Sequence, residues 1–149
     1  MEHILVADDG SEAALKAVEI AAELAAKTGA SLVALAVIDP AGFGMADLKA
    51  FARSEGLDMS TAIQPLVEAA AAYLDRCRVV AERHGVDQYR SEICTGDDTA
   101  RGILDFAREH AIDLIVVGSR GRGRLPGLVL GSVSQNLASH ATTSLLIAR

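Results

Sequence analysis

The residues best suited to bind a ligand lie in a glycine-rich stretch near the end of the sequence, at residues 118–134. This stretch reads GSRGRGRLPGLVLGSVS and directly follows the apolar run IDLIVV at residues 112–117. A run rich in β-branched residues is typical of a parallel strand buried on both faces. Glycines after such a strand let the backbone turn sharply and let a ligand approach the main-chain amides.

Ser132 and Ser134 follow these glycines and open a helix that we expect over residues 133–139. A helix N-terminus presents free N–H groups and partial positive charge, and hydroxyls in its first turn add donors. The stretch therefore predicts a phosphate-binding loop, although a flexible crossover without a ligand also fits the residues. It is not a Walker A motif, because the last lysine of the sequence is Lys49.

Two carboxylates, Asp8 and Asp9, follow the first expected strand, His3–Ala7. An acid after a strand accepts hydrogen bonds from ribose hydroxyls in other dinucleotide-binding folds, but acids also form turns and cap helices. The residues alone leave both roles open. Val37 and Ile38, at the end of the second expected strand, fit either the wall of an adenine slot or an ordinary core.

The remaining pattern alternates strands with helices. We expect strands at residues 3–7, 31–38, 86–94, 112–117 and 143–148, and helices at 11–28, 61–84, 98–111 and 133–139, with a short helix at 47–53. This alternation predicts an α/β fold with a five-stranded parallel sheet and helices on both faces. For the strand order 3-2-1-4-5, the order reverses between the first and fourth strands, which is where ligands bind in such sheets. The Asp8-Asp9 turn and the glycine stretch therefore converge on one crevice.

Composition narrows the class of protein. The 149 residues suit a single domain, half of them are apolar, and the net charge is −6. All the acidic residues lie at or before Asp113, whereas the part from Leu114 onward carries four arginines. This distribution favours a small anionic ligand over nucleic acid. We expect a cytoplasmic protein, because no membrane span or secretory signal is visible. Cys77 and Cys94 have no metal-site or redox spacing.

The spacing Gly118-x2-Gly121-x9-Gly131-Ser132 resembles that of the ATP-binding branch of the universal stress protein family. The stretches ILVADDGSEAALKA at 4–17, LAVID at 35–39 and DLIVVGSRGRG at 113–123 are similar to that family too. The resemblance implies a Rossmann-like fold of the adenine nucleotide alpha hydrolase type that commonly dimerises through its last strand, here from Thr143 to Ala148. It also implies an adenine nucleotide, usually ATP although ADP and AMP stay open, with Mg²⁺ on the phosphates.

The same resemblance implies roles for particular residues. Asp9, rather than Asp8, would hold the ribose, and Ala7 and Val37 would flank adenine. Gly118 would lie near the ribose. The rest of the expected nucleotide site comes from the glycine stretch and the helix after it: Ser119, Arg120, Gly121, Arg122, Gly131, Ser132, Val133 and Ser134.

The sequence departs from the family in two places. Asp98 and the pair Thr143-Ser144 stand where the family often has proline. Neither change touches the expected pocket, although the second lies at the expected dimer edge.

The function favoured by these residues is that of an ATP-binding regulatory module, in which a partner protein or the dimer itself responds to nucleotide occupancy. From Leu114 onward there is no acidic residue and no lysine, so we expect at most slow ATP hydrolysis. A nucleotide-free scaffold of the same family is the alternative. Against it stands the expectation that no packing reason demands Gly118, Gly121 and Gly131 together. Residues 41–60 fit either a lid or a partner-contact surface, and the sequence does not decide between them.

Overall fold

The computed structural model describes residues 1–40, 45–121 and 130–149. Within them, five strands form one parallel sheet in the order β3-β2-β1-β4-β5, as the alternation predicts. The strands are β1 (His3–Ala7), β2 (Ser31–Ile38), β3 (Tyr89–Thr95), β4 (Leu114–Gly118) and β5 (Ser144–Ala148). β1 and β2 match the predicted bounds, whereas β3 begins three residues later than expected, and β4 begins two residues later and ends one residue later.

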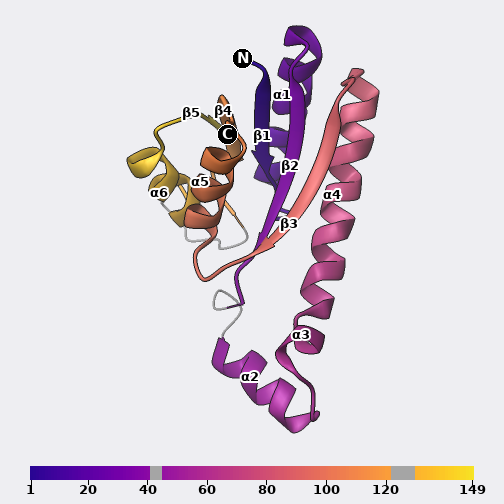
Figure 1. Ribbon diagram of the computed structural model, residues 1–149, viewed down its shortest axis with the longest axis vertical. Helices are drawn as coiled ribbons and strands as arrows, with labels where there is room; N and C mark the ends of the chain where they lie inside the picture. The colour runs from indigo at the N-terminus through magenta and orange to yellow at the C-terminus, as the bar shows by residue number, and fades with distance from the viewer. Residues whose placement is uncertain (41–44, 122–129) are drawn as a thin grey trace.

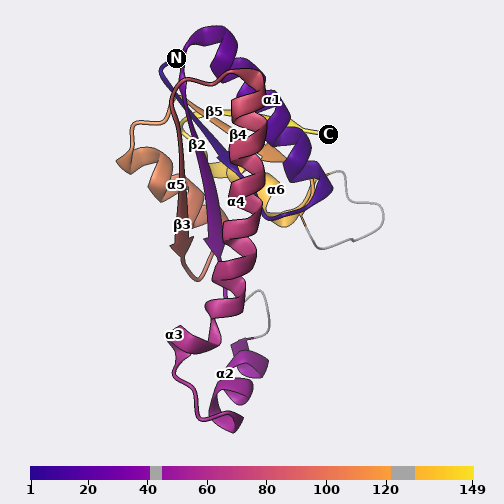
Figure 2. The ribbon, with the colours of Figure 1, turned by 90° about the vertical axis from the view of Figure 1, so that its right-hand side faces the viewer.

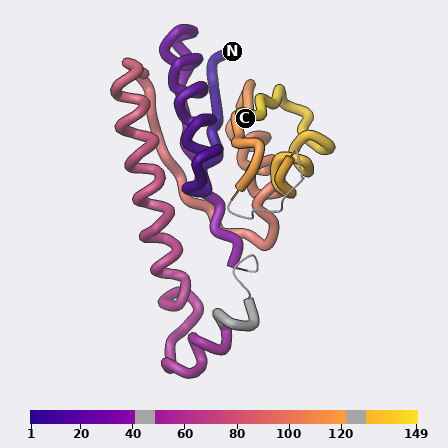
Figure 3. The backbone as a smooth tube through the Cα atoms, turned by 180° about the vertical axis from the view of Figure 1, so that it is seen from behind, coloured from indigo at the N-terminus to yellow at the C-terminus, as the bar shows by residue number. Residues whose placement is uncertain are grey.

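Helices cover both faces of this sheet (Figure 1). α1 (Glu12–Thr28) and α4 (Gln64–His84) pack on one face, and α5 (Thr99–Glu109) and α6 (Ser132–His140) on the other. Figure 3, which views the molecule from behind, shows α1 and α4 running side by side. The caps follow the sequence signals, because Ser11 accepts a hydrogen bond from the Ala14 amide and Gly29 ends α1 at φ 70°.

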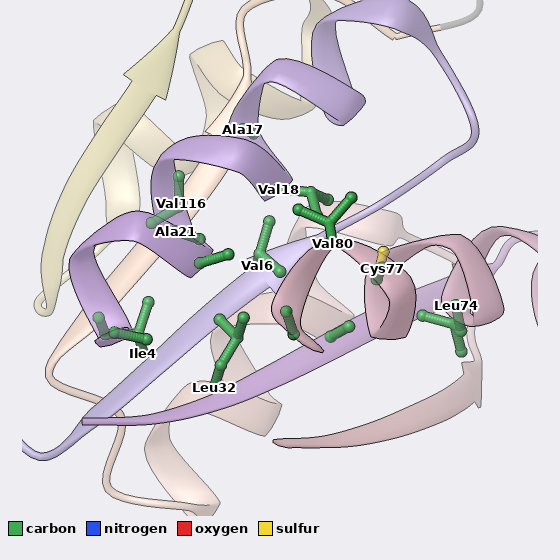
Figure 4. Close-up of a cluster of buried hydrophobic side chains, with 14 of the residues drawn as sticks. Ile4, Val6, Ala17, Val18, Ala21, Leu32, Leu74, Cys77, Val80 and Val116 are labelled. Atoms are coloured by element: carbon green, nitrogen blue, oxygen red, sulfur yellow. The ribbon is translucent and has the colours of Figure 1, made fainter. Parts of the chain in front are cut away.

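Side chains on alternate strand positions divide the core into two layers. Val6 and Leu32 face α1 and α4, whereas Leu5 and Leu35 face α5 and α6. Figure 4 shows the first layer, in which Val18 from α1 and Val80 from α4 meet the strand side chains. Many of the α1 positions are alanine, which lets this helix lie close to the sheet.

The segment between β2 and α4 matches its expected form in part: the short helix expected at residues 47–53 is confirmed and is longer, but a second short helix was not expected. It contains α2 (Met45–Ser54) and the short helix α3 (Met59–Ala62), which Asp58 caps through its side chain. The single helix expected over residues 61–84 is therefore wrong in its first turn: α3 ends at Ala62, and α4 begins at Gln64 with Pro65 in its first turn. Figures 1 and 2 show α2 and α3 beyond the carboxyl ends of the strands.

None of the helices in the described part of the chain is long and apolar enough to cross a membrane.

Candidate nucleotide site

A cavity of about 360 Å³ lies at the carboxyl ends of β1, β2 and β4. This volume is within the range of small-molecule sites, roughly 300–1,000 Å³. The cavity lies where the strand order reverses, between β1 and β4. Both the turn after β1 and the start of the glycine stretch line it, so the two segments meet as their positions in the sequence predict.

The turn after β1 presents Asp9 to this cavity. One carboxylate oxygen of Asp9, Oδ1, accepts a hydrogen bond of 3.0 Å from the Ser11 amide. The other, Oδ2, lies so near Gly121 that a Cβ atom on this glycine would be only 2.7 Å from it. Asp8, the neighbouring acid, also lines the cavity, but its side chain is fully buried and contacts Arg76 and Cys77 of α4. The two acids therefore have different surroundings, and Asp9 is the one beside the glycine stretch.

Ser119 fixes the start of the glycine stretch to two other elements. Its amide donates to the Ala148 carbonyl at the end of β5, at 2.7 Å. Its carbonyl accepts both the Gly131 amide, at 2.7 Å, and the Ser134 hydroxyl, at 3.0 Å. The chain before residue 122 and the chain after residue 129 are thus joined at the base of the stretch. Ser119 itself is buried and is not among the residues that line the cavity.

Gly118 has a packing role that the sequence analysis did not anticipate. A Cβ atom here would lie 2.6 Å from the carbonyl carbon of Ala13 and 2.8 Å from the Ala14 amide nitrogen. The first turn of α1 therefore lies directly on the end of β4. The expectation that no packing reason demands these glycines is wrong at Gly118, so this position alone does not distinguish a nucleotide site from a scaffold.

The N-terminus of α6 forms another wall. Gly131 is the N-cap residue of α6. Because it has no side chain that could accept a hydrogen bond from the first turn, main-chain amides of that turn stay available to a ligand. Ser132 is exposed at the cavity. Ser134 also lines the cavity, but it is buried and its hydroxyl donates to the carbonyls of Ser119 and Gly131, both at 3.0 Å. Of these two hydroxyls, the one on Ser132 is the better placed to reach a ligand.

The apolar side of the cavity comes from both faces of the sheet. Ala7 and Val37 line it from the α5 face, together with Thr99 and Ile103 of α5. Gly102 lets α5 lie close to this wall, because a Cβ atom here would be 3.1 Å from Val37 Cγ1. A flat aromatic base fits between such small apolar side chains.

α4 supplies a wall of the cavity that is not predicted from the sequence. This wall consists of one face of the helix: Leu66, Ala69, Ala70 and Tyr73. The helical spacing of apolar residues predicts that Leu66 and Ala70 face inward, but spacing does not reveal that this part of α4 extends past the ends of the strands. Asp39, directly after β2, also lines the cavity and was not predicted.

Of the residues expected to bind a nucleotide, most line this one cavity: Ala7, Asp9, Val37, Gly118, Arg120, Gly121, Gly131, Ser132, Val133 and Ser134. Arg122 lies outside the described residues. Within the described part of the chain, no group of three or more His, Cys, Asp or Glu side chains is arranged to hold a metal ion.

Comparison with known proteins shows that one family model matches the whole chain. The family model described as "Universal stress protein family" matches residues 1–149. The universal stress protein YxiE of Bacillus subtilis is 31% identical over 146 residues, which cover 98% of this chain and 97% of that protein.

Solved structures show the same fold. The universal stress protein UspA from Lactobacillus plantarum has a TM-score of 0.79 at 28% identity, covering 99% of this chain and 97% of that one. A universal stress protein crystallised in complex with cAMP has a TM-score of 0.71 at 25% identity, covering 99% and 96%.

Proposed function

Because the chain belongs to the universal stress protein family, we propose that its cavity binds an adenine nucleotide and that the protein acts as a nucleotide-dependent regulatory module. One observation carries this proposal: the turn containing Asp9 and the glycine stretch line the same cavity at the switch point of the sheet. The cAMP complex of a protein with this fold supports the choice of an adenine nucleotide.

Each part of the nucleotide has a matching wall. The base would lie between Ala7 and Val37, and the ribose hydroxyls would donate to the Asp9 carboxylate. The phosphates would accept hydrogen bonds from main-chain amides near Gly121 and Gly131 and from the Ser132 hydroxyl. Arg120, exposed at the cavity, adds positive charge on the phosphate side.

ATP is the ligand we propose first, with Mg²⁺ bound to its phosphates. The acid-free, arginine-bearing part of the chain from Leu114 onward favours a highly charged anion. The same composition lacks the acids and the lysine with which efficient phosphoryl-transfer enzymes hold metal and phosphate. We therefore propose binding with slow turnover at most, so that occupancy rather than hydrolysis is the signal.

A homodimer through β5 is part of the proposal. β5 is at the edge of the sheet, and Leu145, Leu146 and Ile147 on it are only partly buried. Pairing with a second copy would cover this edge. Ser119 connects β5 to the glycine stretch, because its amide donates to Ala148.

Mass spectrometry of the nucleotides released from the purified, denatured protein tests the proposal. We expect ATP, ADP or AMP in amounts comparable to the protein, and a raised melting temperature when ATP and Mg²⁺ are added to stripped protein. A stripped protein whose melting temperature does not respond to any adenine nucleotide would leave only the scaffold alternative.

A further inference from the structure

One face of α4 holds the turn that carries Asp9. Tyr73, Arg76 and Cys77 are spaced i, i+3 and i+4, so they share one side of this helix. This side packs against the end of β1 and the turn after it, as contacts of all three residues show. Figure 4 shows Cys77 on α4 between Leu74 and Val80 at the edge of the core.

Asp8 is the centre of these contacts. Its side chain is 0% exposed, and its Oδ2 atom accepts the Cys77 thiol at 3.2 Å and Nη2 of Arg76 at 3.5 Å. Its Oδ1 atom accepts the Gly10 amide at 2.8 Å. A buried carboxylate needs such partners, because burial without them is costly. Burial, followed by the negative charge of Asp8, raises the pKa of the Cys77 thiol, so the thiol keeps its proton and donates.

Tyr73 covers the far end of the same turn. Gly10 has φ +80°, and a Cβ atom on it would lie 2.6 Å from Cε1 of the Tyr73 ring. The Arg76 guanidinium lies 5.9 Å from the centre of that ring, a cation–π arrangement. Arg76 therefore contacts both Asp8 and the ring that lies over Gly10.

Asp9 lies between these two fixed residues. Its own Oδ1 atom accepts the Ser11 amide, and its Oδ2 atom lies beside Gly121. The direction of the Asp9 carboxylate thus depends on a turn that α4 holds at Asp8 and at Gly10.

We propose that Tyr73, Arg76 and Cys77 are positioning residues that act through Asp8 and Gly10 to aim the Asp9 carboxylate at the ribose hydroxyls of the ligand. This inference rests on the proposed function, because it assigns a task to Asp9 in that same site. It adds that discrimination of the ribose depends on three residues of α4 that hold the turn.

The test compares the dissociation constants of ATP and 2′,3′-dideoxy-ATP, which lacks the hydroxyls that Asp9 would accept. The wild-type protein should bind ATP more tightly. In Arg76→Met this preference should fall about fivefold, the order expected when one charge-assisted contact is lost. Tripolyphosphate, which has no ribose, should bind both proteins equally.

Arg78→Met is the matched control. Arg78 lies on the same helix and forms ion pairs with Asp75 and Glu82, but it has no contact with the turn. Its variant should keep the full preference for ATP. A second pair of variants tests the same role if Arg76→Met does not fold. Cys77→Ser keeps a donor for Asp8 and should keep the preference for ATP, whereas Cys77→Val removes the donor and should reduce this preference.

The outcomes separate the inference from the proposed function. If the wild-type protein binds no adenine nucleotide, the proposed function fails. If it binds ATP with a ribose preference that Arg76→Met and Cys77→Val leave unchanged, or if these variants weaken ATP and dideoxy-ATP equally, the positioning role is overturned while nucleotide binding stands. Equal binding of both nucleotides by the wild-type protein would also overturn it, since Asp9 would then not read the ribose.

Discussion

The Asp9 carboxylate lies against the α-carbon of Gly121, so that a Cβ atom at residue 121 would be 2.7 Å from Asp9 Oδ2. These residues are more than a hundred positions apart in the sequence, and the strand order brings them together across the β1–β4 junction. No side chain fits at residue 121 unless Asp9 moves. The glycine stretch and the acidic turn therefore form one unit, and a change in either should affect the ligand bound between them.

Gly121→Ala should weaken ATP binding about tenfold, because the new methyl group displaces the Asp9 carboxylate or shifts the start of the glycine stretch. Fluorescence competition with a labelled ATP analogue measures the change. Gly96→Ala is the control, since a Cβ atom there meets only one atom, 4.0 Å away. Equal affinities of the two variants for ATP would show that the Asp9–Gly121 contact does not shape the site.

Gly118→Ala should destabilise the protein by about 2 kcal/mol, since overpacked positions typically cost 1–3 kcal/mol. Its Cβ atom would meet main-chain atoms of Ala13 and Ala14, which cannot move without shifting α1. Urea unfolding measures the loss, again with Gly96→Ala as the reference. A Gly118→Ala protein as stable as the wild type would mean that α1 tolerates displacement from β4.

Ser134→Ala should lower the free energy of unfolding by about 1–2 kcal/mol, because it leaves the Ser119 carbonyl with one partner fewer in a buried place. Ser139→Ala on the same helix is a matched control: its hydroxyl also donates to a carbonyl, that of Gln135, but it is exposed. Thermal unfolding compares the two. A loss no greater for Ser134→Ala than for Ser139→Ala would contradict a structural role for this buried hydroxyl.

Stability at acid pH should depend on Asp113. Its Oδ2 atom accepts the amides of Glu2 and His3, and these hydrogen bonds lower the pKa of the carboxyl below its ordinary 3.8. Because the folded pKa is lowered, the carboxylate stabilises the fold above pH 3.8, and this contribution is lost as the pH falls toward the folded value.

Urea unfolding of the wild type and of Asp113→Asn between neutral pH and the onset of acid unfolding measures this dependence. The wild-type protein should be the more stable at neutral pH, and the two curves should converge in acid. Parallel curves would show that the Asp113 charge does not contribute.

The sequence predicted the sheet well because its signals are local. Three apolar residues followed by Asp8-Asp9 mark β1, and Ser11 and Gly29 mark the two ends of α1. The prediction is poorer at β3, which starts at Tyr89 rather than at residue 86, because a polar edge strand has weak alternation. It is poorer also between β2 and α4, where Asp58 caps a short helix that no apolar period announces.

The part of the site that lies at the ends of the strands could be predicted from the sequence. The position after β1 and the position after β4 must be neighbours once the strand order is given, so Asp9 and Gly121 could be paired from the sequence. The α4 wall could not be predicted, because how far a helix extends past the sheet depends on the packing of its whole length. Nor could the burial of Asp8, since two adjacent acids look alike in the sequence and only the packing of α4 against one of them distinguishes the two.

The most direct test of nucleotide binding is a calorimetric titration of the nucleotide-free, wild-type protein with ATP in the presence of Mg²⁺. We expect saturable binding of about one ATP per chain, because one nucleotide would occupy the cavity at the β1–β4 switch point. Absence of binding heat at millimolar ATP, together with an unchanged melting temperature, would contradict it.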